Sequence, residues 1–222
     1  MELIKDQLIV SCQALPEEPL YSPFIMKKMA YAAMKGGAKG IRANSVEDIR
    51  AIKEAVDLPI IGIIKKVYEE SDVFITPTLA EIDDLYKEGV DMIAIDATSR
   101  KRPDGNFIEQ IFPVIKEKYA DQAFMADCST YEEAKVAYEL GFDCIGTTLS
   151  GYTDYTRGNQ LPDTLLIKKL LEDIPVPIIA EGGIWTPEQL KTVFDLGVHS
   201  AVVGTAITRP MNITERFIDA IK

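Results

Sequence analysis

Cysteine and histidine are scarce in this chain of 222 residues. Its three cysteines, Cys12, Cys128 and Cys144, lie far apart in the sequence, and no CxxC pair occurs. An odd number of widely spaced cysteines argues against both a disulfide framework and a zinc site, so a reducing cytoplasm is the expected compartment. The single histidine, His199, falls in a predicted turn between a helix and a strand. We therefore expect acid–base chemistry to depend on other side chains.

Long apolar runs and an excess of positive charge are also absent. No hydrophobic stretch approaches the ~20 residues of a membrane span. The first six residues, MELIKD, lack the apolar core of a signal peptide. The formal net charge is −11, which argues against binding to nucleic acid or to an anionic membrane surface. We expect neither as a partner.

What the chain does contain is a regular alternation of strand-like and helix-like segments. Short β-branched runs recur near residues 8, 40, 59, 92, 123, 144, 177 and 201, with helical patterns between them. Strict alternation indicates a parallel sheet with right-handed crossovers. Eight units in a chain of this length favour closure into a barrel. We predict an α/β protein, a single (β/α)8 TIM-barrel domain over residues 1–222, with a short lead-in helix in residues 1–7.

The same patterns predict element boundaries. Thr78, Thr130 and Thr186 each precede a helical pattern and are followed three residues later by Glu or Gln, which indicates helix caps. The expected strands include residues 8–14, 59–65 and 144–150, and the expected helices include residues 161–173 and 212–221.

Polar side chains close seven of the eight predicted strands. Functional residues of such barrels lie where strands end at their carboxyl side. A single polar residue there often only meets solvent, but seven that converge on one mouth indicate a site. The seven are Gln13, Arg42, Lys65, Asp96, Asp127, Thr148 and Glu181.

Lys65 closes an isoleucine-rich strand, where burial of an unpaired ammonium is costly. Desolvation lowers the pKa of such a lysine toward neutrality and makes it a base, an acid or a Schiff-base nucleophile. Lys66 follows directly and points to the opposite face, so these residues alone leave open which lysine faces the mouth. Glu181 is a base, an acid or the counter-ion of the lysine. Arg42 suits bidentate recognition of an oxygen-rich ligand.

Two glycine-ended strands near the C-terminus indicate a phosphate site. Glycine lets backbone N–H groups approach an anion without a Cβ in the way. The loops after strands 7 and 8 form the usual phosphate cradle of a (β/α)8 barrel. Arg209, just after the eighth strand, is placed to complete it. No metal site is expected, although Asp96, Asp127 and Glu181 have the carboxylates that Mg²⁺ binds.

Nine motifs span the chain from about residue 8 to its C-terminus. They are SCQAL (11–15), GIRA (40–43), IGIIK (61–65), ITPT (75–78), DAT (96–98) with RP (102–103), AD (126–127), TTLSGYT (147–153), AEG (180–182) and VGxAITRP (203–210). Together they resemble the motifs of N-acylglucosamine-6-phosphate 2-epimerases, also called N-acetylmannosamine-6-phosphate 2-epimerases.

The resemblance implies a cytoplasmic barrel enzyme of amino-sugar and sialic-acid catabolism. It would interconvert N-acetylmannosamine 6-phosphate and N-acetylglucosamine 6-phosphate without a metal or an organic cofactor. In one departure, the family often carries a larger residue, such as arginine, at the position of Gly183, so backbone N–H groups must serve here. The site residues implied are catalytic Lys65 and Glu181, substrate-binding Gln13, Arg42, Asp127 and Thr148, and phosphate-binding Gly182, Gly183, Gly204 and Arg209.

Epimerisation at C2 requires an opened ring, in which an aldehyde acidifies the C2 proton. The hypothesis is that Lys65 removes and returns that proton, alone or with a second group such as a substrate hydroxyl. Glu181 would assist ring opening and balance the lysine charge, and Arg42 would stabilise the enolate-like oxygen or the N-acetyl carbonyl. Two alternatives are a Schiff-base aldolase or lyase of a phosphorylated sugar and a non-catalytic sugar-phosphate sensor. The sequence leaves the oligomeric state open, with a homodimer as one option.

Overall fold

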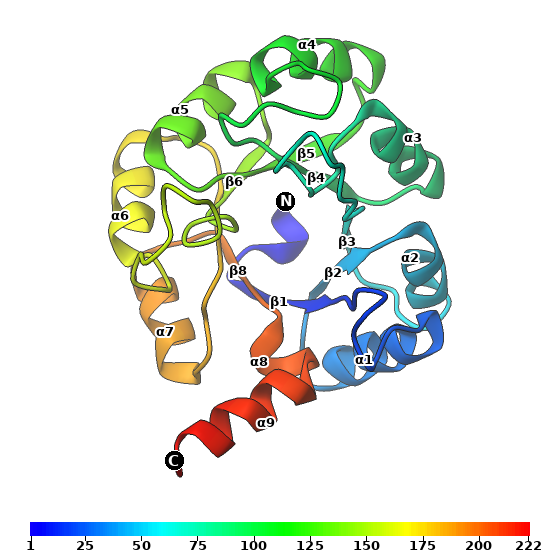
Figure 1. Ribbon diagram of the computed structural model, residues 1–222, viewed down its shortest axis with the longest axis vertical. Coiled ribbons are helices and arrows are strands. Elements are labelled where there is room, and N and C mark those ends of the chain that lie inside the picture. Colours follow the sequence, from blue (N-terminus) through cyan, green and yellow to red (C-terminus); the bar gives the residue numbers. More distant parts are fainter.

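The computed structural model describes residues 1–222 and shows a closed barrel of eight parallel strands with the helices outside it (Figure 1). The strands follow one another in chain order, and β8 pairs with β1 to close the barrel. The predicted TIM barrel is confirmed. The strands are β1 (Gln7–Cys12), β2 (Gly40–Asn44), β3 (Ile60–Ile63), β4 (Met92–Asp96), β5 (Ala123–Asp127), β6 (Cys144–Gly146), β7 (Ile178–Glu181) and β8 (Ser200–Val203).

The helices lie between successive strands and cover the outer face of the sheet. They are α1 (Pro23–Lys35), α2 (Val46–Lys53), α3 (Leu79–Glu88), α4 (Ile108–Lys118), α5 (Tyr131–Leu140), α6 (Thr164–Asp173), α7 (Pro187–Asp195), α8 (Thr205–Thr208) and α9 (Pro210–Asp219). A short 3-10 turn, η1 (Glu2–Ile4), precedes β1 and crosses the middle of the barrel in Figure 1. Its Ile4 joins the interior cluster, so η1 plugs one end of the barrel.

Successive side chains along each strand point to opposite faces of the sheet, which gives the barrel an inner and an outer apolar core. One row of side chains, which includes Ile9, Ile61, Met125 and Val202, fills the barrel interior. The other row packs against the helices in the largest apolar cluster. Every second side chain along a strand faces the interior. The polar residues at the strand ends keep this spacing, so they face the mouth of the barrel.

The predicted helix caps are confirmed. Thr78, Thr130 and Thr186 each form a capping box with the residue three positions later. Each box satisfies backbone N–H groups of the first helical turn that have no partner inside the helix. These caps fix where α3, α5 and α7 begin and therefore how long the preceding loops are.

Three predicted strands are shorter than expected. β1 ends at Cys12, β3 at Ile63 and β6 at Gly146, so Gln13, Lys65 and Thr148 lie in the loops that follow. The reason is visible at β3, whose ladder with β4 stops at Gly62. Beyond that point Lys65 pairs instead with Ile75 in an isolated antiparallel bridge.

Two predicted helices also differ. The helix expected at residues 161–173 begins at Thr164, because Asp163 caps it by accepting a hydrogen bond from Leu166 N at 3.0 Å. The helix expected at residues 212–221 is preceded by the separate turn α8, and α9 begins at Pro210. Proline fits the first helical position because that N–H has no helical partner.

The last helix, α9, projects away from the barrel, and none of its residues is buried (Figure 1). No helix combines the length and the hydrophobicity needed to cross a membrane.

Candidate active site

A cavity of about 160 Å³ opens at the carboxyl ends of the strands. Its lining comes from β1, β7 and β8, the loops that follow β3, β6 and β7, and α8. It brings together eight of the ten predicted site residues: Gln13, Lys65, Thr148, Glu181, Gly182, Gly183, Gly204 and Arg209. The other two, Arg42 and Asp127, are absent from the lining and are almost fully buried.

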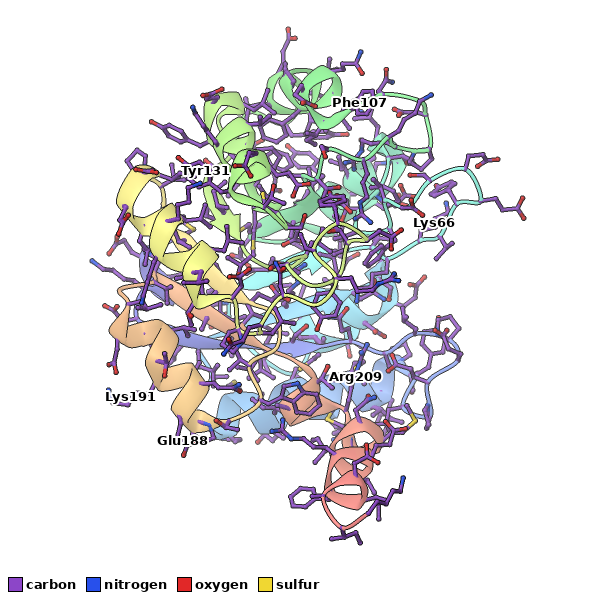
Figure 2. The ribbon with its side chains drawn as sticks, turned by 60° about the vertical axis from the view of Figure 1, so that its left-hand side comes forward. Lys66, Phe107, Tyr131, Glu188, Lys191 and Arg209 are labelled. Atoms are coloured by element: carbon purple, nitrogen blue, oxygen red, sulfur yellow. The ribbon has the colours of Figure 1, made fainter.

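Of the two adjacent lysines, Lys65 lines the cavity and Lys66 points away from it. The Lys65 backbone N–H donates to Asn44 Oδ1 at 2.7 Å, which fixes the start of the loop after β3. Burial lowers the pKa of Lys65 to about 8, and the nearby cations Arg209 and Arg42 add to the effect. Lys66 instead pairs with Glu81 at 3.1 Å and is half exposed, at the edge of the molecule in Figure 2.

Glu181 ends β7 and contributes a carboxyl to the same cavity. Burial raises its pKa to about 7, against the opposing effect of Arg42. Its Oε2 atom lies 3.2 Å from Arg42 Nη1 and accepts a hydrogen bond from Thr148 Oγ1 at 3.3 Å. The ion pair of Glu181 is therefore with Arg42, whereas no ion pair joins it to Lys65, its expected counter-ion.

Arg42 and Asp127 form a buried ion pair beneath the cavity. Arg42 Nη2 donates to Asp127 Oδ2 at 2.6 Å, Nη1 donates to Oδ1 at 3.2 Å, and both side chains are at most 1% exposed. The carboxylates of Asp127 and Glu181 raise the pKa of the guanidinium further, against its desolvation. The bidentate pairing predicted for Arg42 is thus made with a protein carboxylate. Arg42 positions Asp127 and Glu181 from below.

Gly182 and Gly183 form the turn after β7, where a phosphate cradle is expected. Their φ angles are +105° and +67°, a conformation that glycine adopts without strain. The backbone N–H groups of Gly182, Gly183 and Gly204 donate no hydrogen bond within the chain, which leaves them free for an anion. Arg209 lines the same side and pairs with Glu18 at 3.1 Å.

The structure explains why residue 183 is glycine in this chain. A Cβ atom at this position would lie 2.2 Å from Leu161 Cβ, far inside van der Waals contact. Leu161 occupies the space that a larger residue would need, so backbone N–H groups are the donors available there.

Gln13 and Thr148 complete the polar lining. Gln13 donates to Ser11 Oγ at 2.7 Å, but its buried Oε1 atom has no partner and is available to a ligand donor. Thr148 donates to Asp127 Oδ1 at 2.6 Å and so links the buried ion pair to the cavity.

Asp96 is the strand-end polar residue that does not join the site. Its carboxylate accepts hydrogen bonds from Thr98 and Arg100 of its own loop, and it is fully buried away from the cavity. Because Asp96 pairs within its own loop, it is not part of the site, unlike the other six polar residues predicted at the strand ends. No three His, Cys, Asp or Glu side chains are grouped in a way that would hold a metal ion.

Sequence reasoning missed the apolar part of the lining. Phe74, Ile75, Ile184 and Trp185 all contribute to the cavity. Phe74 and Ile75 precede the Thr-Pro turn of one quoted motif and Trp185 follows the glycine turn, but nothing in their spacing distinguishes them from ordinary core residues.

The fold and the cavity define a class: a (β/α)8-barrel enzyme with a partly buried amine, a partly buried carboxyl and free backbone donors after β7 and β8. The family model described as "Putative N-acetylmannosamine-6-phosphate epimerase" matches residues 26–222. The chain belongs to this family.

Individual relatives agree with that assignment. A Clostridioides difficile (strain 630) protein described as "Putative N-acetylmannosamine-6-phosphate 2-epimerase" is 55% identical over 222 residues, which cover 100% of this chain and 99% of the relative. The solved structure of the N-acetylmannosamine-6-phosphate 2-epimerase from Clostridium perfringens is 52% identical, with a TM-score of 0.94 over 99% of this chain and 95% of that one. Thiamine phosphate pyrophosphorylase from Pyrococcus furiosus, with a TM-score of 0.61 and 19% identity over 94% and 90% of the two chains, shares the fold alone.

Proposed function

We propose that this enzyme interconverts N-acetylmannosamine 6-phosphate and N-acetylglucosamine 6-phosphate by moving the proton at C2 of the open-chain sugar. The observation that carries the proposal is a partly buried amine and a partly buried carboxyl in one cavity, both with pKa values shifted toward neutrality. Shifted pKa values of this kind are typical of acid–base catalysts. Membership of the epimerase family supplies the substrate class.

The chemistry at C2 requires a base in its neutral form. The neutral amine of Lys65 accepts the C2 proton, and the electron pair left at C2 is delocalised onto the aldehyde oxygen as an enolate. Return of a proton to the opposite face gives the epimer, from Lys65 itself or from a second group such as a substrate hydroxyl. A pKa of about 8 leaves roughly a tenth of the amine neutral near pH 7.

Glu181 is placed to assist ring opening. With a pKa of about 7, a large fraction of its carboxyl is protonated near neutral pH and can donate a proton to the ring oxygen. The bond from C1 to the ring oxygen then breaks, and the anomeric hydroxyl gives its proton to solvent as the aldehyde forms. Arg42 holds Glu181 and, with Thr148, positions Asp127 at the base of the cavity. Gln13 Oε1 accepts from a sugar hydroxyl or the amide N–H.

The glycine turn and Arg209 bind the phosphate. The N–H groups of Gly182, Gly183 and Gly204, together with the Arg209 guanidinium, surround the end of the cavity where this anion fits. Binding energy at a group far from C2 holds the flexible open chain in a reactive conformation. The proposed reaction needs only protein side chains and the substrate.

Proton NMR of N-acetylmannosamine 6-phosphate in D₂O with enzyme, with and without EDTA, tests this function. We expect the C2 proton signal to disappear while the gluco epimer accumulates, at the same rate with EDTA present. A sugar that stays protonated at C2 and unconverted would contradict the proposal.

The two alternatives predict different outcomes. A Schiff-base lyase would leave a borohydride-trapped adduct on Lys65, and a sensor would bind the sugar phosphate without exchange at C2. The family comparison supports neither.

The proposal extends to the setting of the enzyme. We extend the proposal to a role in sialic-acid degradation in the cytoplasm, which is the setting that the family resemblance implies. The assembly proposed is a homodimer. Its support is an apolar stripe formed by Ile213 and Phe217, four residues apart on α9, a helix with no buried residue, and by the exposed Ile221 just beyond its end. A second copy of the chain would cover this stripe.

A further inference from the structure

Arg102 is a second deeply buried cation, and it lies outside the cavity. It belongs to the loop between β4 and α4, is 1% exposed and forms no ion pair. Its guanidinium donates to three backbone carbonyls: Asp96 O at 2.6 Å, Thr76 O at 2.8 Å and Pro77 O at 3.0 Å. Burial of an ion without a carboxylate partner costs free energy. The three carbonyl contacts offset part of that cost, and they show which segments this arginine holds together.

Two of these carbonyls belong to residues 73–77, which we call the strap. The strap runs antiparallel to the residues that follow β3. Lys66 N donates to Phe74 O at 2.9 Å, Thr76 N donates to Ile64 O at 2.8 Å, and Lys65 forms a bridge with Ile75. Arg102 therefore holds the segment against which the Lys65 backbone is paired.

The strap contains a strained residue. Thr76 has a φ angle of +48°, which is rare for a β-branched residue. Such a conformation persists only where surrounding contacts hold it. The contacts that do so here include the Thr76 hydroxyl, which donates to Ala94 O at 2.7 Å and accepts from Ile64 N at 3.3 Å, and Arg102, which binds the Thr76 carbonyl.

The strap also forms the apolar wall beside the Lys65 amine. Phe74 and Ile75 line the cavity with Lys65, and Lys65 Nζ lies 6.0 Å from the centroid of the Phe74 ring. Burial is the main cause of the lowered pKa of Lys65. Displacement of this wall would admit water to the amine.

We propose that Arg102 is a positioning residue for Lys65: by holding the strap, it keeps Phe74 and Ile75 against the amine and fixes the Lys65 backbone. Arg102 touches neither the cavity nor the substrate and acts only through the strap. The catalytic consequence rests on the proposed role of Lys65 as the base. The structural consequence, a Lys65 amine shielded from water on one side and held in place, does not depend on that role.

The test compares Arg102→Lys with Arg100→Lys. Lysine keeps the charge but lacks the planar fork that reaches three carbonyls. Arg100 is a matched control, because it lies in the same loop and binds Asp96 and Thr98 side chains but not the strap. The measurement is the pKa of Lys65 itself, from the pH dependence of its acetylation by trace acetic anhydride, quantified by mass spectrometry of the Lys65 peptide.

We expect Arg102→Lys to raise the pKa of Lys65 by about one unit or more, because water reaches the amine. In the same variant kcat near pH 7 should fall ~10-fold and the pH at which kcat is greatest should move upward with the pKa of Lys65, while KM changes less than about 3-fold. Arg100→Lys should leave the pKa of Lys65 unchanged.

A lower melting temperature with an unchanged pKa of Lys65 would overturn the proposal, because Arg102 would then be only structural. If the pKa of Lys65 rises but the pH dependence of kcat does not move, the positioning role stands and the proposed base is wrong.

If Arg102→Lys does not fold, Thr76→Val decides the question. It removes the hydroxyl that ties the strap to Ala94, so a raised pKa of Lys65 supports the strap mechanism and an unchanged one overturns it.

Discussion

The reactivity of the two central side chains comes mainly from burial. Lys65 and Glu181 have no ion pair with each other, yet desolvation moves their pKa values in opposite directions toward neutrality. Arg42 compensates the charge of the ionised Glu181 carboxylate, because its Nη1 atom lies 3.2 Å from Glu181 Oε2. At the scale of single residues, the site therefore depends on side chains that exclude water as much as on those that react.

Replacement of Lys65 by methionine should remove the base while conserving volume. We expect kcat to fall by about 10³-fold or more and the dissociation constant for the sugar phosphate to change little, because the phosphate cradle is untouched. Steady-state kinetics and calorimetric binding measure the two quantities. Lys66→Met, on the exposed neighbour, is the matched control and should keep near-normal turnover; a reversed pattern would contradict the assignment.

The pH dependence follows from the two shifted pKa values. In the proposed mechanism Lys65 acts as a neutral base, so activity should rise as pH increases through about 8. Glu181 acts as a protonated acid, so activity should fall as pH increases through about 7. The product of the two fractions is greatest between these values, which predicts a bell-shaped kcat/KM with its maximum there.

Glu181→Gln provides the check on this profile. The amide cannot titrate, so the alkaline limb should disappear from kcat/KM while overall activity falls. A variant that keeps the alkaline limb would show that another group is responsible for it.

At the scale of elements, loops that follow short strands build the cavity. β3 and β6 end before Lys65 and Thr148, and the turn after β7 depends on two consecutive glycines. These segments leave the ladder early, so their side chains and N–H groups face the mouth instead of a neighbouring strand.

The glycine turn gives a stability prediction. Gly183→Ala combines a left-handed φ with a Cβ atom 2.2 Å from Leu161 Cβ, so we expect a loss of about 2 kcal/mol or more in unfolding free energy. Gly141→Ala is the control: its φ is +89° but nothing lies within 4 Å of the added Cβ, so only strain of about 1 kcal/mol is expected. Urea denaturation measures both, and Leu161→Ala added to Gly183→Ala should recover part of the loss.

A buried acid in α2 gives a second prediction at this scale. Asp48 is 1% exposed, its Oδ2 atom has no hydrogen-bond partner, and burial raises its pKa to about 6. Because the folded pKa lies above the unfolded value, this residue makes stability fall as pH rises from about 4 to about 6. Asp48→Asn should therefore stabilise the protein by about 1 kcal/mol at pH 7 and have little effect below about pH 4. An equal change in melting temperature at both pH values would contradict this account.

For the whole molecule, the unusual feature is α9, which leaves the compact barrel (Figure 1). Figure 2 shows Arg209 where this helix begins, so the proposed phosphate site and the projecting helix share one segment of chain. Arg216 of α9 lies over the Trp185 ring at 4.8 Å, and Trp185 lines the cavity. The proposed assembly through α9 and the proposed phosphate binding would thus involve neighbouring residues.

The homodimer proposal predicts that Phe217→Asp weakens association. A charge in the middle of the apolar stripe must be desolvated in any interface, which costs several kcal/mol. Sedimentation velocity should show a dimer for the unmodified protein and a shift toward monomer for the variant. Lys222→Ala, at the end of the chain beyond the stripe, is the control; a monomer in the unmodified protein at micromolar concentration would end the proposal.

Much of this structure was predictable from the order of residues. Eight alternating units specify a closed parallel barrel, because each short apolar strand must be covered by the helix that follows it. The positions of Gln13, Thr148 and Glu181 at strand ends also predict that they face the mouth, whereas the choice of Lys65 over Lys66 came from the family resemblance and from the structure. The caps at Thr78, Thr130 and Thr186 follow from local hydrogen bonding, which depends on neighbours within four residues.

The tertiary structure alone decided which of these polar groups face the cavity and which are tied to the protein. Asp96 is bound by Arg100 of its own loop, and Arg42 is bound by Asp127 from the far side of the barrel, 85 positions away in the sequence. It also decided that Leu161 fills the space at Gly183, that Arg102 holds the strap, and that α9 stands apart. Apart from the Asp96–Arg100 pair, which is local, these outcomes depend on contacts between segments distant in sequence. The energies of such contacts are set by burial and packing, and no local pattern encodes either quantity.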